Sequence, residues 1–228
     1  MRRALFLQHE PLGTPGLAGE RAAAVGLDVV AVRADGAPEL PDAADFDVVV
    51  TLGSSASVGD AGVPWIARER ETLRRAIARD VPVLGICFGG QMLAHALGGA
   101  VHPARVAEVG WFAIETRDPA LVPPGPWVQW HYESFDVPPG AVEIARSPAG
   151  PQAFTHGPHL GLQFHPEVSG EMMGRWTEAF RGELVRAGVD PARIAADTAR
   201  HAAAARAAAH RLFDAFLARA TRLRAAAR

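Results

Sequence analysis

The sequence predicts an α/β fold: an open, mainly parallel sheet with helices on both faces. In the first half of the chain, short apolar runs alternate with stretches of helical spacing. That alternation is typical of βαβ units, whose parallel strands are buried on both faces. The chain has 228 residues, which is enough for one core of good size. One α/β domain is therefore expected, rather than two small ones.

The elements of the first half follow in the order strand, helix, strand. Pro64 stands at a favourable first-turn position of a helix, Gly53 ends a strand, and Gly98 and Gly99 end a helix. We expect strands at 4–7, 28–33, 46–52 and 81–86, and helices at 16–26, 64–79 and 89–97.

The pattern changes after residue 100, where short strands alternate with Pro/Gly turns such as those at 123–125 and 138–140. We expect these strands to extend the same sheet as antiparallel additions, and a helix over 170–187 to follow them. The strands are predicted at 109–116, 127–130, 141–146, 152–155 and 160–164.

Residues 188–228 are expected to form a helical extension of a domain that spans residues 1–187. From Pro191 onward the chain is rich in Ala and has eight Arg against two Asp, and one long helix is predicted. In one interpretation the helix packs on the domain or on a neighbouring subunit of a homo-oligomer. In another it docks an acidic partner. A partial apolar face is provided by Ile194, Leu212, Phe213, Phe216, Leu217 and Leu223.

Composition narrows the classes of function. The formal net charge is −2, so a general nucleic-acid or membrane-surface binder is not expected. No apolar run approaches the roughly 20 residues that a membrane span needs, and the first residues do not resemble a signal peptide. The single cysteine, Cys87, fits a reducing compartment. A cytoplasmic protein is expected.

The most informative stretch is a Gly-x-Cys-x-Gly turn between a predicted strand and a predicted helix. Hydrolases with a nucleophile elbow use this arrangement, in which Gly85 and Gly89 leave room for a tight turn. The helix N-terminus favours the thiolate of Cys87, and the N–H of Phe88 can face a developing oxyanion. The alternative is that Cys87 is a small buried hydrophobe, but such a residue does not need glycines on both sides.

A thiol nucleophile needs a base, and the base needs an orienting group. Of the nine histidines, His165 is the best candidate, because it ends a predicted strand and is followed by Pro166 and Glu167. Pro166 favours an extended backbone at His165, from which Glu167 can reach the imidazole. Strand-end His and Cys can meet at the carboxyl edge of one sheet. The alternative is a loop tripeptide without a role.

Together these residues resemble the class I, or triad, glutamine amidotransferases. Residues 85–91 (GICFGGQ) are similar to the family's nucleophile block, and residues 163–168 (QFHPEV) to its His-Pro-Glu block. Residues 52–54 are similar to its oxyanion loop. Residues 130–135 (WHYESF) resemble the segment that helps to hold glutamine in the glutaminase domain of GMP synthase. The resemblance covers about residues 3–185.

The resemblance implies a flavodoxin-like fold, no metal and no cofactor. It implies that Cys87 attacks the glutamine carboxamide, that His165 transfers protons and that Glu167 orients His165. The backbone N–H groups of Gly53, Ser54 and Phe88 would form the oxyanion hole. The substrate would be held by Gln91, His131, Tyr132, Ser134 and Phe135.

Three functions remain open on the sequence. The first is a glutaminase that delivers ammonia to a separate synthetase or other acceptor subunit, and the second is a stand-alone hydrolase of γ-glutamyl amides. The third is a non-catalytic regulatory relative, against which the intact triad argues. Tyr132 stands where GMP synthase has a small residue, so it either narrows the pocket or is a solvent-facing edge aromatic. The loop 53–58 is a candidate regulatory element.

Overall fold

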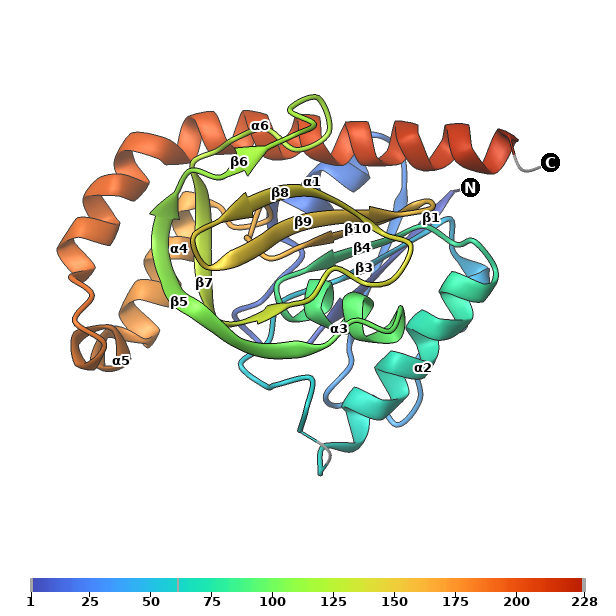
Figure 1. Ribbon diagram of the computed structural model, residues 1–228, viewed down its shortest axis with the longest axis horizontal. Helices are drawn as coiled ribbons and strands as arrows, with labels where there is room; N and C mark the ends of the chain where they lie inside the picture. The colour runs from blue at the N-terminus through green and yellow to red at the C-terminus, as the bar shows by residue number, and fades with distance from the viewer. Residues whose placement is uncertain (1, 61, 227–228) are drawn as a thin grey trace.

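The computed structural model, described over residues 2–60 and 62–226, is built on an eight-stranded sheet (Figure 1). The strand order is β2-β1-β3-β4-β10-β9-β8-β6. The first five strands in that order are parallel and the last three are antiparallel. The predicted fold class is confirmed. The strands are β1 (Arg3–Gln8), β2 (Asp28–Arg33), β3 (Val48–Thr51), β4 (Val83–Ile86), β6 (Glu115–Thr116), β8 (Val142–Ser147), β9 (Gly150–His156) and β10 (His159–Leu162).

Helices cover both faces of this sheet because its parallel strands are apolar on both sides. In β1, Ala4 and Phe6 belong to one buried cluster, whereas Leu5 and Leu7 belong to another. The first cluster is covered by helices α1 and α6, and the second by α2 and α3. The helices are α1 (Gly16–Ala24), the 3₁₀ turn η1 (Ala43–Asp45), α2 (Pro64–Ala78), α3 (Phe88–Ala96), α4 (Gly170–Ala179), α5 (Arg181–Arg186) and α6 (Pro191–Ala226).

Two of the predicted additions do not join the main sheet. Strands β5 (Val101–Phe112) and β7 (Trp127–Phe135) pair with each other as a separate antiparallel sheet. The expectation of a single sheet was wrong here, because the apolar side chains of this pair pack elsewhere. Val128 and the partly buried Trp130 contact a third cluster, which includes Met173 of α4.

The helix predicted over 170–187 is two helices that meet at Phe180. This residue has φ −105° and ψ 15°, so it ends α4 and precedes α5. Its ring turns inward to lie 5.7 Å from the ring of Trp130. The helix is therefore interrupted at the residue that contacts Trp130. Helical periodicity does not reveal this contact between distant segments.

The long terminal helix α6 packs on the domain. Phe213 and Phe216 are each 1% exposed. Arg21 of α1 donates two hydrogen bonds, of 2.8 and 2.7 Å, to Asp214. Leu223 lies outside this contact, with 39% of its surface exposed. These contacts support the interpretation in which the helix covers the domain itself.

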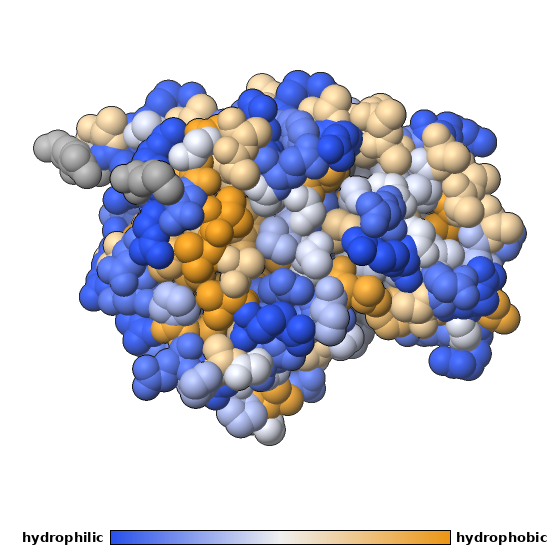
Figure 2. Space-filling model, turned by 180° about the vertical axis from the view of Figure 1, so that it is seen from behind, coloured by the Kyte–Doolittle hydropathy of each residue, from blue (hydrophilic) through white to orange (hydrophobic). Residues whose placement is uncertain are grey.

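The surface of the molecule is mixed. The face opposite that of Figure 1 is largely hydrophilic, with apolar side chains gathered in a band at one side (Figure 2). Within the described part of the chain, no helix is both long enough and apolar enough to cross a membrane.

Replacing Phe216 by alanine is expected to lower the free energy of unfolding by about 3–5 kcal/mol, because the ring is buried in the core and leaves a cavity. Leu223→Ala, about two helical turns further along α6, is the matched control and should cost about 0.5 kcal/mol. Urea denaturation would measure both. Equal losses would mean that α6 does not depend on this contact.

Candidate active site

Cys87 lies between β4 and α3 in a backbone conformation that few residues adopt. Its φ is +54° and its ψ is −112°. Such a conformation costs about 1–3 kcal/mol and persists only where the surrounding structure enforces it. A Cβ at Gly85 would overlap the carbonyl of Gly89, and one at Gly89 would overlap that of Thr51. Glycine is therefore needed for α3 to begin directly against the sheet. The Cys87 N–H donates to the Leu162 carbonyl at 2.9 Å, so the turn is fixed to the end of β10.

His165 and Glu167 follow β10 and reach the same place. The His165 N–H donates to the carbonyl of Val128 in β7 at 2.8 Å. Its ring Nδ1 lies 2.8 Å from Glu167 Oε1, and its ring stands edge-on to Trp176 at 5.1 Å. Both side chains are buried. With Nδ1 bound to the carboxylate, the other ring nitrogen is left for the thiol.

The charges around His165 favour an ion pair between its imidazole and the thiol of Cys87. Burial alone would lower the pKa of His165, but the neighbouring Glu167 and Cys87 outweigh it and raise the pKa to about 10. An imidazole with that pKa is protonated at neutral pH. A positive charge beside a thiol favours the thiolate, which is the nucleophilic form of cysteine.

The predicted oxyanion loop lies against both catalytic candidates. A Cβ at Gly53 would come within 2.8 Å of His165 Cε1 and 3.8 Å of Cys87 Cβ, so only glycine fits there. Ser54 lines the same cavity as Cys87. The N–H of Phe88 belongs to the first residue of α3, directly after the nucleophile.

The next residues of this loop are bound on both sides of the cavity. The Ser55 N–H donates to the carboxylate of Glu10. The hydroxyl of Ser57 donates to Glu133 Oε1 at 2.9 Å. The loop thus spans from the end of β1 to β7, above the nucleophile.

A cavity of about 340 Å³ opens onto Cys87, which is near the lower end for small-molecule sites. Its wall is acidic and aromatic, and none of its lining residues is an arginine. The carboxylates are those of Glu10, Glu133, Glu167 and Glu183. The aromatic rings are those of Trp130, Tyr132, Trp176 and Phe180.

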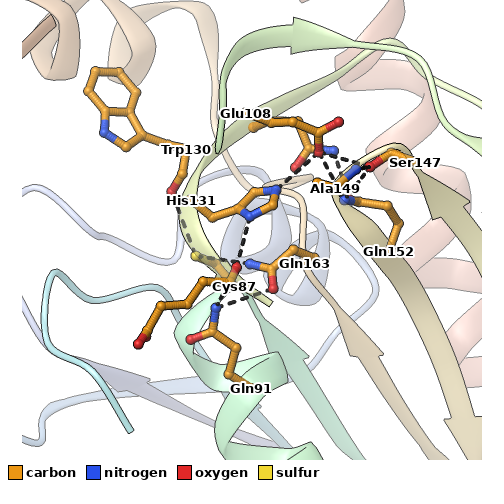
Figure 3. Close-up of polar contacts among 11 residues, drawn as sticks. Cys87, Gln91, Glu108, Trp130, His131, Ser147, Ala149, Gln152 and Gln163 are labelled. Carbon is orange, nitrogen blue, oxygen red and sulfur yellow. Dashed lines mark hydrogen bonds and ion pairs between the residues drawn. The ribbon is translucent and has the colours of Figure 1, made fainter. Parts of the chain in front are cut away.

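Gln91 lines the cavity from α3, but its amide nitrogen is bound to the protein. It donates to the Glu133 carbonyl at 3.3 Å and to Gln163 Oε1 at 3.2 Å (Figure 3). Gln163 in turn donates to the sulfur of Cys87 at 3.7 Å. Gln91 therefore joins α3 to β7 and supports the amide that contacts the thiol.

His131 also lines the cavity, and both of its ring nitrogens face oxygen acceptors. Nδ1 lies 2.9 Å from the Glu133 carbonyl and Nε2 lies 3.1 Å from Glu108 Oε2. Glu108 also accepts from Ser147 and Gln152, each at 3.0 Å (Figure 3). His131 thus fixes the backbone of β7 where β7 borders the cavity.

The remaining predicted binding residues separate into two groups. Tyr132 is 44% exposed and its hydroxyl donates to Glu183 at 3.0 Å across the mouth of the cavity. Burial and Glu183 raise the pKa of Tyr132 to about 12.

Ser134 and Phe135 do not line the cavity. Strand β7 continues through them, paired with β5, so they lie beyond the site, and Phe135 packs on Phe154 at 5.2 Å.

Sequence reasoning missed a buried pair beside the oxyanion loop, His9 and Glu69. His9 resembled an ordinary loop histidine. The available signal was Glu69, a charged residue in the apolar stripe of α2 between Ile66 and Leu73, at helical spacing. The acidic wall of the cavity carries no such signal, because its four carboxylates come from four separate segments.

Removing His165 should slow the alkylation of Cys87 by iodoacetamide at pH 6.5 by about tenfold or more, because a free thiol with a pKa of about 8.5 is only ~1% thiolate there. In the wild type the raised pKa keeps His165 protonated up to about pH 10, so the charge beside the thiol does not change between pH 6 and 8 and the rate should be nearly flat there. The rate in His165→Ala should rise with pH over that range. The exposed His102→Ala is the control. A steep wild-type profile would contradict the ion pair.

Comparisons with known proteins identify the family of this chain. The family model for "Glutamine amidotransferase class-I" matches residues 19–180. The "GMP synthase [glutamine-hydrolyzing]" of Aeropyrum pernix is 35% identical over 125 residues, which are 51% of this chain and 24% of that protein. The enzyme of the same name from Thermomicrobium roseum is 36% identical over 137 residues, 55% of this chain and 24% of that protein. Each match thus covers about a quarter of its curated relative.

Solved structures match nearly the whole chain. A glutamine amidotransferase from Thermotoga maritima superposes with a TM-score of 0.86 at 26% identity, covering 95% of this chain and 98% of that one. A glutamine amidotransferase from Methylobacillus flagellatus gives 0.88 at 28% identity, covering 96% and 95%. The family model covers most of the chain, including the nucleophile turn and His165. The chain therefore belongs to the class-I glutamine amidotransferase family.

Proposed function

We propose that this chain hydrolyses the side-chain amide of glutamine to glutamate and ammonia. The observation that carries the proposal is the meeting of Cys87, His165 and Glu167 at one end of a single cavity, with Cys87 on a turn that points its thiol there. A nucleophile, a base and an orienting group in this relation form a triad for acyl transfer.

The proposed reaction has two halves. The Cys87 sulfur attacks the amide carbon, and the C–N bond breaks as His165 gives its proton to the departing nitrogen, releasing ammonia. The product is a γ-glutamyl thioester on Cys87. Water then attacks the thioester carbon while His165 takes a proton from it. The C–S bond breaks, glutamate leaves, and the thiolate and imidazolium are restored.

The negative oxygen formed in each half needs donors. The N–H groups of Phe88 and of the Gly53–Ser54 segment are the proposed ones, since these residues lie on either side of Cys87. Removing one such donor costs about 10²–10³ in kcat in other enzymes. The carboxylates of Glu10, Glu133 and Glu183 are suited to the α-ammonium group of the substrate.

The proposed ammonia acceptor is a synthetase, by analogy with relatives named as glutamine-hydrolysing GMP synthases. A cytoplasmic location accords with free glutamine as substrate and with a nucleophile that must stay reduced.

Hydrolysis of larger γ-glutamyl amides is the second candidate. The observation that favours it is the mouth of the cavity, where the exposed side chain of Tyr132 in β7 reaches across to Glu183 of α5. A leaving amine larger than ammonia would have to pass or displace this bridge.

Incubating the chain with glutamine and with a series of γ-glutamyl amides tests the two candidates. We expect glutamate release from glutamine, and its loss by at least about 10⁴-fold in Cys87→Ala, since the nucleophile is removed. The Leu223→Ala variant is a control for handling and folding. Turnover of γ-glutamyl amides without turnover of glutamine would select the second candidate. Full activity of Cys87→Ala would refute the mechanism.

Shortening Tyr132 should change substrate choice. In Tyr132→Ala the bridge to Glu183 is lost and the mouth widens, so kcat/KM for a bulky γ-glutamyl amide should rise about tenfold relative to glutamine, the scale of roughly 1.4 kcal/mol. Tyr132→Phe removes only the hydrogen bond to Glu183 and keeps the ring. It therefore separates the effect of the hydrogen bond from the effect of side-chain size. The ratio of the two kcat/KM values is the readout, and an unchanged ratio in Tyr132→Ala would make Tyr132 a solvent-facing aromatic.

A further inference from the structure

A second histidine–carboxylate pair lies beneath the oxyanion loop, outside the triad. His9 follows β1, Glu69 lies on α2, and both side chains are fully buried. His9 Nε2 is 2.6 Å from Glu69 Oε2, and the hydroxyl of Thr51 donates to the other carboxylate oxygen. Removing charges from water costs several kcal/mol per ion, so such a pair is a poor way to gain stability alone.

The other ring nitrogen of His9 faces the oxyanion loop. Nδ1 lies 3.1 Å from the carbonyl oxygen of Gly53. Since both nitrogens face oxygen acceptors, a protonated ring offers each of them a donor. Burial alone would lower the pKa of His9, but the charge and hydrogen bond of Glu69, with the Gly53 carbonyl, raise it.

Aromatic rings hold the imidazole ring of His9 in place. Trp65 is stacked on it at 4.9 Å and Phe88 meets it edge-on at 5.0 Å. Phe88 is the residue whose N–H follows the nucleophile. The pair is therefore packed against both halves of the proposed oxyanion hole.

The consequence for the loop follows from peptide geometry. In a planar trans peptide, the carbonyl of one residue and the N–H of the next point in opposite directions. Glycine has little intrinsic preference that would hold this peptide in one orientation. Because His9 binds the Gly53 carbonyl, the Ser54 N–H is directed away from His9. Gly53 itself lies against His165 and Cys87 on the side of the cavity.

We propose that His9 and Glu69 are positioning residues that lock the Gly53–Ser54 peptide with the Ser54 N–H toward the developing oxyanion. This inference rests on the proposed amide hydrolysis. It also bears on the sequence-based hypothesis that the loop is regulatory, because in this proposal the contacts of His9, Thr51 and Glu69 order the loop within the chain.

Two substitutions at position 9 separate the contact of His9 with Gly53 from its contact with Glu69. The amide nitrogen of asparagine is as many bonds from Cα as Nδ1, and that of glutamine as many as Nε2. His9→Asn can therefore still donate to Gly53, whereas His9→Gln can donate only to Glu69. We expect His9→Gln to lose about 10²-fold in kcat, the effect of one oxyanion donor, with KM changed less than about threefold. His9→Asn should stay within about tenfold of the wild type.

Alkylation of Cys87 by iodoacetamide is the second readout, because that displacement develops no oxyanion. Its rate should stay within about twofold of the wild type in both variants. Equal kcat in His9→Asn and His9→Gln would overturn the proposal. So would a parallel loss of hydrolysis and alkylation, which indicates general damage to the site. If His9→Gln does not fold, the double variant His9→Leu/Glu69→Leu is the second one, because apolar replacement of a buried ion pair is often tolerated. It lacks the donor to Gly53, so the same loss of kcat and unchanged alkylation are expected.

Failure of the proposed function can be distinguished from failure of the lock. If the wild type hydrolyses none of the amides, deuterium exchange of the backbone amides in residues 52–56 tests the lock directly. Exchange should be at least about tenfold faster in His9→Gln than in His9→Asn, the ratio for a loss of roughly 1.4 kcal/mol. Equal exchange in the two variants would refute the lock.

Discussion

The closeness of α3 to the sheet is the constraint on which the site depends. A Cβ at Gly85, Gly89 or Gly90 would overlap a main-chain carbonyl of a neighbouring segment. Because these carbons are absent, the N–H of Gly89 can donate to Leu52 at 3.0 Å and that of Cys87 to Leu162 at 2.9 Å. The start of one helix thus joins the ends of β3, β4 and β10. The thiol, the oxyanion loop and the His-Pro-Glu segment are consequently fixed relative to one another by main-chain hydrogen bonds.

A histidine paired with a carboxylate occurs three times in and beside the cavity. His165, His131 and His9 are each buried against a carboxylate, at 2.8, 3.1 and 2.6 Å. In each case one ring nitrogen is held by the acid and the other is presented to a different group. For His131 and His9 that group is a backbone carbonyl, whereas for His165 it is the thiol. One arrangement therefore serves both to orient the backbone and, in our proposal, to move protons.

The parts of the fold and site that the sequence predicts are those specified locally. The apolar runs, the Gly-x-Cys-x-Gly turn and the His-Pro-Glu segment each carry their information within a few residues. The pairing of β5 with β7 depends on which distant cluster accepts Trp130 and Val128. The contacts of His9 reach 44 residues to Gly53 and 60 residues to Glu69. No local pattern encodes such distances, so these features became visible only once the chain was folded.

The length of α6 has a mechanical consequence. A helix of 36 residues is about 54 Å long, and α6 is fastened at several points. It holds α1 through Asp214, holds β5 through a 2.9 Å hydrogen bond between Trp111 and Thr198, and packs against α4 beside Gly170. Trp176 of α4 forms one wall of the cavity. Displacing that wall would require the long helix α6 to bend. Any accommodation of ligands of different size must come from another part of the wall, such as the exposed side chain of Tyr132.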